Sequence, residues 1–257
     1  MTADPTESTV VARLRAAGCV FAEDEARLLV AAAASGAELE DLVDRRVEGE
    51  PLEHLLGWVG FCGLRLAVGP GAFVPRQRTA LLARQAVSLA RPGGVVVDLC
   101  CGVGAVGAAV IASVPGTELH AADISPEAVA LARRNLPDAE VHQGDLFDAL
   151  PARLRGRVDV LAANVPYVPS GAVALMPPEA RDHEPRAALD GGADGLDVAR
   201  RVLAGAPPWL APAGSVLFEV AEEQVPAAVD AVTAAGLRAR VVADDELGAT
   251  VVVGTSA

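Results

Sequence analysis

The sequence predicts an α/β protein with a doubly wound, seven-stranded sheet, a C-terminal antiparallel hairpin and a small N-terminal helical domain. Two observations carry this prediction. From Arg91 onward, strand patterns and helix patterns alternate, which favours a parallel sheet with helices on both faces. The last two strand patterns are separated only by residues 247–250, a connection too short for a crossover helix, so these strands should pair antiparallel.

Residues 1–50 are predicted to form the small helical domain. Within it, residues 6–49 place apolar side chains at helical spacing in segments that end at or near a glycine. Residues 51–72 follow as an aromatic and β-branched run interrupted by glycines, which predicts a β-hairpin linker. Residues 73–257 then form the large domain.

Strands of the large domain should end at a common edge where a ligand binds, because ligands of doubly wound sheets lie at the carboxyl ends of the strands. The predicted buried strands are 95–101, 118–125, 140–145, 158–167 and 214–221, and the hairpin strands are 239–246 and 251–256. Amphipathic segments such as 126–136 supply the covering helices.

Glycines and acidic side chains gather where the first strands end. The turn Gly102-Val-Gly104 can bend tightly and present backbone N–H groups, although G-x-G-x-x-G over 102–107 also fits a dinucleotide site. Carboxylates at three successive strand ends suit a cationic, phosphate-free adenosine ligand, with Asp98 for an amino group, Asp123 for ribose hydroxyls and Asp145 for the adenine amine. The predicted cofactor-binding residues of this edge are Asp98, Cys100, Gly102, Gly104, Asp123, Ile124, Asp145 and Leu146.

Charge and composition narrow the function classes. The formal net charge is −13, which disfavours direct binding of nucleic acid or of an anionic membrane. The chain has four cysteines without C-x-x-C spacing and an N-terminus without a signal-peptide pattern, so we expect free thiols and a cytoplasmic location. Uncharged stretches are interrupted by glycine or proline, so no membrane span is expected. The four histidines are scattered along the chain, and no metal site is predicted.

A set of motifs spread over residues 45–257 resembles one family. The motifs are RRVEGEPLEHLLG (45–57), VPRQRT (74–79), NVPY (164–167), HEPRAALDGGADGLD (183–197) and FEVAEEQ (218–224). In this order, over residues 45–257, they resemble the protein-(glutamine-N5) methyltransferases that modify peptide chain release factors. The resemblance implies S-adenosyl-L-methionine as cofactor, a release factor as protein substrate and the methyltransferase form of the sheet. It also places Phe73, Arg76 and Thr79 beside the cofactor, together with Asn164.

Residues 164–167 are the predicted catalytic motif. An amide nitrogen is a poor nucleophile, because its lone pair is delocalised into the carbonyl, so its N–H groups must be held by oxygens in a reactive geometry. The side-chain oxygen of Asn164 and the backbone carbonyl of Val165 are the expected acceptors. Pro166 would then fix the direction of the chain, and Tyr167 would pack against the substrate amide.

The chain departs from the family pattern at a few positions, which leaves more than one function open. Val165 replaces the first proline of N-P-P-Y, Cys100 replaces a glycine, and Gln77-Arg78 replaces Pro-Glu. The acceptor could therefore be another glutamine. Three further functions compete with methylation of a release factor: adenine-N6 methylation of nucleic acid, cofactor binding without turnover, and NAD-dependent redox chemistry. The sequence predicts no particular oligomeric state.

Overall fold

The computed structural model describes residues 6–256 and is built around a seven-stranded sheet of order β5-β4-β3-β6-β7-β9-β8. The strands are β3 (Val95–Leu99), β4 (Glu118–Asp123), β5 (Glu140–Gln143), β6 (Val158–Ala163), β7 (Leu210–Val220), β8 (Arg238–Asp244) and β9 (Ala249–Thr255). Neighbours from β5 to β7 pair in parallel, and β9 is antiparallel to both β7 and β8. The doubly wound sheet with its final hairpin is therefore confirmed. The strand order reverses between β3 and β6.

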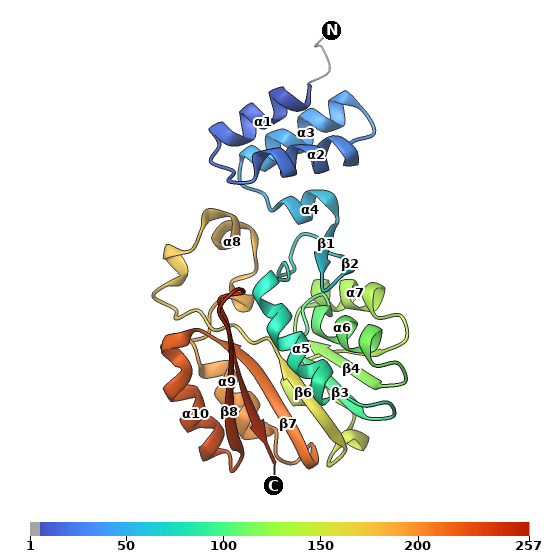
Figure 1. Cartoon of the computed structure of the whole chain (residues 1–257), viewed down its shortest axis with the longest axis vertical. Coiled ribbons are helices and arrows are strands. Elements are labelled where there is room, and N and C mark those ends of the chain that lie inside the picture. Colours follow the sequence, from blue (N-terminus) through green and yellow to red (C-terminus); the bar gives the residue numbers. More distant parts are fainter. Residues whose placement is uncertain (1–5, 257) are drawn as a thin grey trace.

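Helices cover both faces of the sheet, as Figure 1 shows. They are α5 (Ala80–Leu89), α6 (Ala105–Ser113), α7 (Pro126–Asn135), α9 (Asp197–Gly205) and α10 (Val225–Ala234). Successive strand residues point to opposite faces, so Val96 packs in the core with α5, α6 and α7, while Val97 packs in the core with α9 and α10. Helix α5 precedes the point at which the predicted alternation began and is an addition to the sequence prediction.

The N-terminal helices form a separate cluster at one end of the molecule (Figure 1). They are α1 (Glu7–Ala16), α2 (Ala22–Ala32) and α3 (Gly36–Val47), and they enclose a core of their own that contains Leu14, Leu29 and Val43. A buried ion pair joins Arg46 Nε of α3 to Glu25 Oε2 of α2 at 2.6 Å. Residues 1–5, at the start of the predicted helical domain, lie outside the described residues. No helix of residues 6–256 has the length and apolar character that crossing a membrane requires.

The linker differs in part from its prediction. A hairpin is present, with β1 (Trp58–Phe61) paired to β2 (Leu64–Ala67), but the preceding residues form a short helix, α4 (Leu52–Leu56). A second unpredicted short helix, α8 (Pro178–His183), lies in the long connection between β6 and α9. The predicted fourth strand also extended too far, since β6 ends at Ala163 and the NVPY segment leaves the sheet.

Two glycines on either side of α6, Gly104 before it and Gly116 in the turn after it, allow a matched test of packing. Gly104 and Gly116 have nearly the same left-handed backbone, with φ of +82° and +84°. A Cβ at Gly104 would lie 2.7 Å from Leu136 Cδ1, whereas a Cβ at Gly116 would meet open space. We expect Gly116→Ala to cost about 1 kcal/mol of stability from the backbone alone. Gly104→Ala should cost roughly 2–4 kcal/mol, because the clash adds to it.

Urea unfolding of both variants and of the unaltered protein measures these losses. Equal losses for the two variants would show that the contact with Leu136 relaxes without cost and would contradict this account of α6.

Candidate active site

A cavity of about 580 Å³ lies at the carboxyl ends of β3, β4 and β6, where the strand order reverses. It is lined by every residue that the sequence predicted for cofactor binding and catalysis, with the exception of Gly104. Gly104 begins α6 and faces Leu136 rather than the cavity, so its requirement for glycine is a matter of packing. The neighbouring Gly102 does line the cavity, and a Cβ there would meet nothing within 4 Å.

The turn after β3 is held by the carboxylate of Asp123. Asp123 Oδ2 accepts a hydrogen bond from the Gly102 backbone N–H at 2.8 Å, and Oδ1 accepts one from Ser125 N–H at 2.9 Å. Within this turn Cys100 has a φ of +55°, a conformation that glycine adopts more easily. This backbone would suit the glycine that the resemblance places at this position. Burial raises the pKa of the Cys100 thiol, which therefore stays protonated.

Asp98 lies in the wall of the cavity, and one of its two carboxylate oxygens accepts no hydrogen bond from the described residues. Its Oδ2 accepts a hydrogen bond from Gly107 N–H of α6 at 2.8 Å, while its buried Oδ1 has no partner among residues 6–256. Burial raises the pKa of this carboxyl to about 7, against the lowering effect of the Gly107 hydrogen bond. A buried carboxylate with a free oxygen beside a cavity favours a cationic ligand, because unpaired buried charge is costly.

The far side of the cavity combines an apolar surface with a polar one. Ile124 is 61% exposed although its neighbours in β4 are mostly buried, and it lines the cavity. Such a side chain can pack against a flat ring. Asp145 receives a hydrogen bond from Arg201 Nη2 of α9 at 2.7 Å, through Oδ2 only. Arg201 also lines the cavity and was not anticipated from the sequence, because nothing in its spacing pairs it with Asp145.

The NVPY segment presents Asn164 to the cavity. The side-chain Oδ1 of Asn164 is buried and lacks a hydrogen-bond partner in the part of the chain that the structure describes. Tyr167 donates its hydroxyl to Glu219 Oε1 of β7 at 2.9 Å. Burial, with the nearby Glu219 carboxylate, raises the pKa of Tyr167, so the phenol remains a neutral donor.

Glycines of the ALDGG-ADGLD block fix the backbone of this segment. A Cβ at Gly191 would lie 2.6 Å from the carbonyl oxygen of Pro166, and one at Gly195 would lie 2.2 Å from that of Tyr167. Any larger residue would push the two segments apart. Gln224 Nε2 adds hydrogen bonds to the carbonyl oxygens of Tyr167 at 2.8 Å and Asp194 at 2.9 Å. The block therefore supports the NVPY segment through the backbone.

Two arginines next to the cavity are oriented by buried carboxylates. Glu184 Oε2 accepts from Arg76 Nη2 at 2.6 Å, and Glu184 Oε1 accepts from Val74 N–H at 3.0 Å. Burial raises the pKa of Glu184, and the guanidinium of Arg76 opposes that rise. Arg78 Nε lies 2.9 Å from Glu219 Oε1 as an ion pair without hydrogen-bond alignment. The sequence drew attention to Arg78 only because Gln77-Arg78 replaces the Pro-Glu of the family pattern.

Comparison with known proteins identifies the family. Residues 77–176 match the sequence model of the methyltransferase small domain. A release factor glutamine methyltransferase of Bifidobacterium longum is 34% identical, over 80% of this chain and 83% of its own length. The chain belongs to the release factor glutamine methyltransferase family. A relative of the same name from Geobacter sulfurreducens is 38% identical, but the match covers only 63% of that protein and 70% of this chain.

A solved structure supports the fold independently. A methyltransferase from Pyrococcus furiosus superposes with a TM-score of 0.56 at 15% identity, covering 75% of this chain and 89% of its own. The methyltransferase form of the sheet is thus confirmed, and with the family it implies S-adenosyl-L-methionine as methyl donor. The cavity fits that molecule, because it offers the unpartnered oxygen of Asp98 and the apolar surface of Ile124.

The raised pKa of Asp98 predicts pH-dependent binding. A ligand with an ammonium group favours the ionised carboxylate, so binding below pH 7 must first remove a proton from Asp98. The affinity for S-adenosylhomocysteine should fall roughly eightfold between pH 7.5 and pH 6 if the ligand requires full ionisation. Calorimetry at both pH values measures this fall.

The matched control is Asp98→Asn, which keeps the shape of the side chain and removes its titration. It should bind more weakly at pH 7.5 and show a nearly flat profile. If this variant keeps the full eightfold dependence, the titrating group is another one.

Proposed function

We propose that this protein transfers a methyl group from S-adenosyl-L-methionine to the side-chain amide nitrogen of a glutamine in the Gly-Gly-Gln loop of peptide chain release factors. The observation that carries the proposal is the buried, unpartnered Asn164 Oδ1 in the wall of the cavity. The names of the relatives support the substrate class. The cofactor, when bound, supplies an electrophilic methyl group on a sulfonium centre.

Residues of the NVPY segment would orient the substrate amide. Asn164 Oδ1 accepts one amide N–H, and the backbone carbonyl of Val165 accepts the other, which directs the nitrogen lone pair away from both oxygens. Hydrogen bonding of this kind costs little at the moment of reaction, because Gly191 and Gly195 already hold the segment in place. Replacing proline by Val165 leaves the carbonyl acceptor present, and Val165 is itself buried.

Tyr167 would form the wall against which the amide packs. Its ring lies beneath the guanidinium of Arg78, whose Cζ is 5.8 Å from the ring centroid, and its hydroxyl is engaged by Glu219. The hydroxyl therefore acts as an anchor for the ring. The neutral phenol takes no proton from the substrate, since burial keeps its pKa high.

The free thiols of the chain support the cytoplasm, where translation occurs, as the place of action.

A transfer assay tests the proposed function. Purified protein, labelled S-adenosyl-L-methionine and a release factor should yield label on the glutamine of the Gly-Gly-Gln loop, located by mass spectrometry of the peptide. A release factor with that glutamine changed to alanine should stay unlabelled. Label on an oligonucleotide instead would favour adenine methylation, and cofactor binding without any transfer would overturn the proposal.

Asn164→Ala should separate binding from catalysis. Removing the acceptor should lower kcat by about 10²–10³-fold, the size of effect seen when one preorganised hydrogen-bonding group is lost from an active site. Its affinity for S-adenosylhomocysteine should change by less than about tenfold, because the other lining residues remain. Steady-state rates and calorimetry measure the two quantities.

The matched control is Gln143→Ala, which removes an exposed amide side chain that does not line the cavity. It should keep the unaltered rate. An Asn164→Ala variant with an equally unaltered rate would exclude this residue from the catalytic step.

A further inference from the structure

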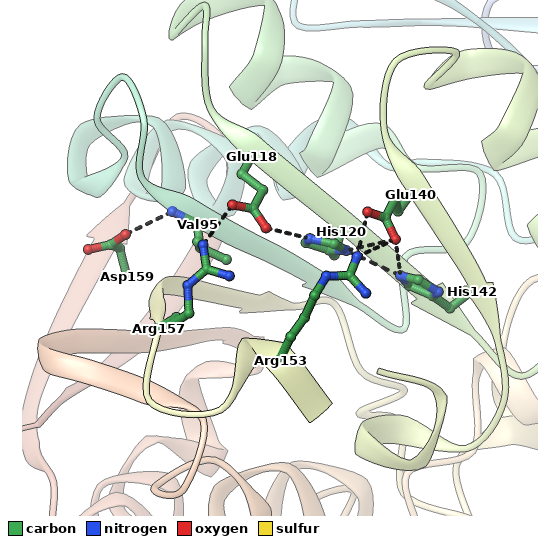
Figure 2. A network of polar contacts seen from close by, with 8 residues as sticks. All are labelled: Val95, Glu118, His120, Glu140, His142, Arg153, Arg157 and Asp159. Atoms are coloured by element: carbon green, nitrogen blue, oxygen red, sulfur yellow. Dashed lines mark hydrogen bonds and ion pairs between the residues drawn. The ribbon is translucent and has the colours of Figure 1, made fainter. Parts of the chain in front are cut away.

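Two adjacent strands carry the same three-residue pattern, Glu-x-His. It occurs as Glu118-Leu119-His120 in β4 and as Glu140-Val141-His142 in β5. The strands pair in parallel with His120 opposite Glu140, so the two patterns are offset by two residues. Since alternate residues of a strand point to one face, all four polar side chains lie on the same face at the edge of the sheet (Figure 2).

The donor atoms of three of these side chains converge. His120 Nδ1 lies 3.2 Å from His142 Nε2. Glu140 Oε2 lies 3.9 Å from His120 Nδ1 and 4.0 Å from His142 Nε2. A tetrahedral zinc ion with ligands at about 2.0–2.1 Å needs donor–donor separations of about 3.3 Å. The two nitrogens already have that separation, and the carboxylate oxygen needs to move by less than about 1 Å.

The contacts behind these donors are those of a metal-ligating histidine. His120 Nε2 lies 3.1 Å from Glu118 Oε1, and Glu118 Oε2 in turn accepts from Arg157 Nη2 at 2.9 Å. A carboxylate that accepts the Nε2–H of a ligating histidine fixes its tautomer and leaves the Nδ1 lone pair for the ion. His142 Nε2 faces His120 Nδ1 across the strand pair and is the second ring nitrogen that can point to an ion.

Charge and access also suit a cation. Arg153 donates to both carboxylate oxygens of Glu140, at 2.5 and 2.6 Å, and each oxygen keeps a second lone pair. Arg153 and Arg157 balance the charges of Glu118 and Glu140, and the two imidazoles are the remaining donors. His120 is 1% exposed, but Glu140 is 55% exposed and His142 20%. The cluster therefore opens to solvent on the side of the edge strand β5.

We propose that His120, Glu140 and His142 bind a divalent first-row transition cation, for which zinc is the best match. Two imidazoles and one carboxylate are a donor set that zinc accepts, with water in the fourth position. None of the three residues lines the active-site cavity, so the ion is separate from methyl transfer. It would bind β5 to β4 through side chains. The even scatter of histidines along the chain had predicted no metal, and the parallel register is what brings two of them together.

Titration of the metal-free full-length protein with Zn²⁺ and with Co²⁺ tests this site. We expect one zinc per chain by calorimetry and the visible absorption bands of four-coordinate Co²⁺ bound to nitrogen and oxygen ligands. Free zinc at about 100 times its Kd should raise Tm by roughly 5–10 °C. The absence of saturable one-to-one binding would overturn the proposal.

Variants separate this site from adventitious binding. His142→Ala, at the partly exposed rim, should lower zinc affinity at least about 100-fold, and Glu118→Gln should lower it about 10–100-fold. Matched controls are His183→Ala, an exposed histidine outside the cluster, and Cys62→Ser, an exposed thiol, and both should bind as the unaltered protein does. Circular dichroism confirms that each variant is folded. A folded His142→Ala that binds zinc with unchanged affinity, or loss of binding in either control, would refute the assignment.

Discussion

Close backbone packing between the glycine block and the NVPY segment is the constraint on which the active site depends. Gly191 and Gly195 approach the carbonyl oxygens of Pro166 and Tyr167 so closely that no side chain fits between them. This contact keeps Asn164 in a position where its buried Oδ1 has no partner among the described residues. A free segment would turn that oxygen toward a donor or solvent, because an unpaired buried polar atom is costly. The glycine block therefore keeps Asn164 Oδ1 without a partner among the described residues.

The charges around the cavity choose between two ligands that its glycine turn could accommodate. A dinucleotide brings phosphates to the turn after β3, and a sulfonium nucleoside brings an ammonium group. Asp98 lies buried behind this turn with one free oxygen, and Asp123 holds the turn itself through Gly102 N–H. A phosphate placed here would face two carboxylates. Burial, together with the nearby Asp123 carboxylate, raises the pKa of Asp98, and a cationic ligand would stabilise the ionised carboxylate, so the cation is favoured.

Sequence patterns predicted the sheet because short strand patterns alternate with helix patterns along the chain, and they predicted the site because strand ends meet at one edge. These patterns failed for short elements and for residues whose partners lie far away in the sequence. Helices α4 and α8 have five and six residues, too few to show a periodicity. Helix α5 follows a 3₁₀ turn without a side-chain cap or an acidic first turn, so its start was unmarked. Arg201 and Glu184 act across the fold, and their partners are not visible in local spacing.

The register of parallel strands explains both what was predicted and what was missed. Residues at strand ends meet whatever the register, so Asp98, Asp123 and Asp145 could be grouped from the sequence. Residues in mid-strand, such as His120 and His142, meet only if the strands take this register, and that depends on the loops between them. Strand β5 has four residues and pairs on one side only. It leads directly to Asp145 in the cavity wall, so side-chain contacts that secure β5 to β4 also secure one wall of the active site.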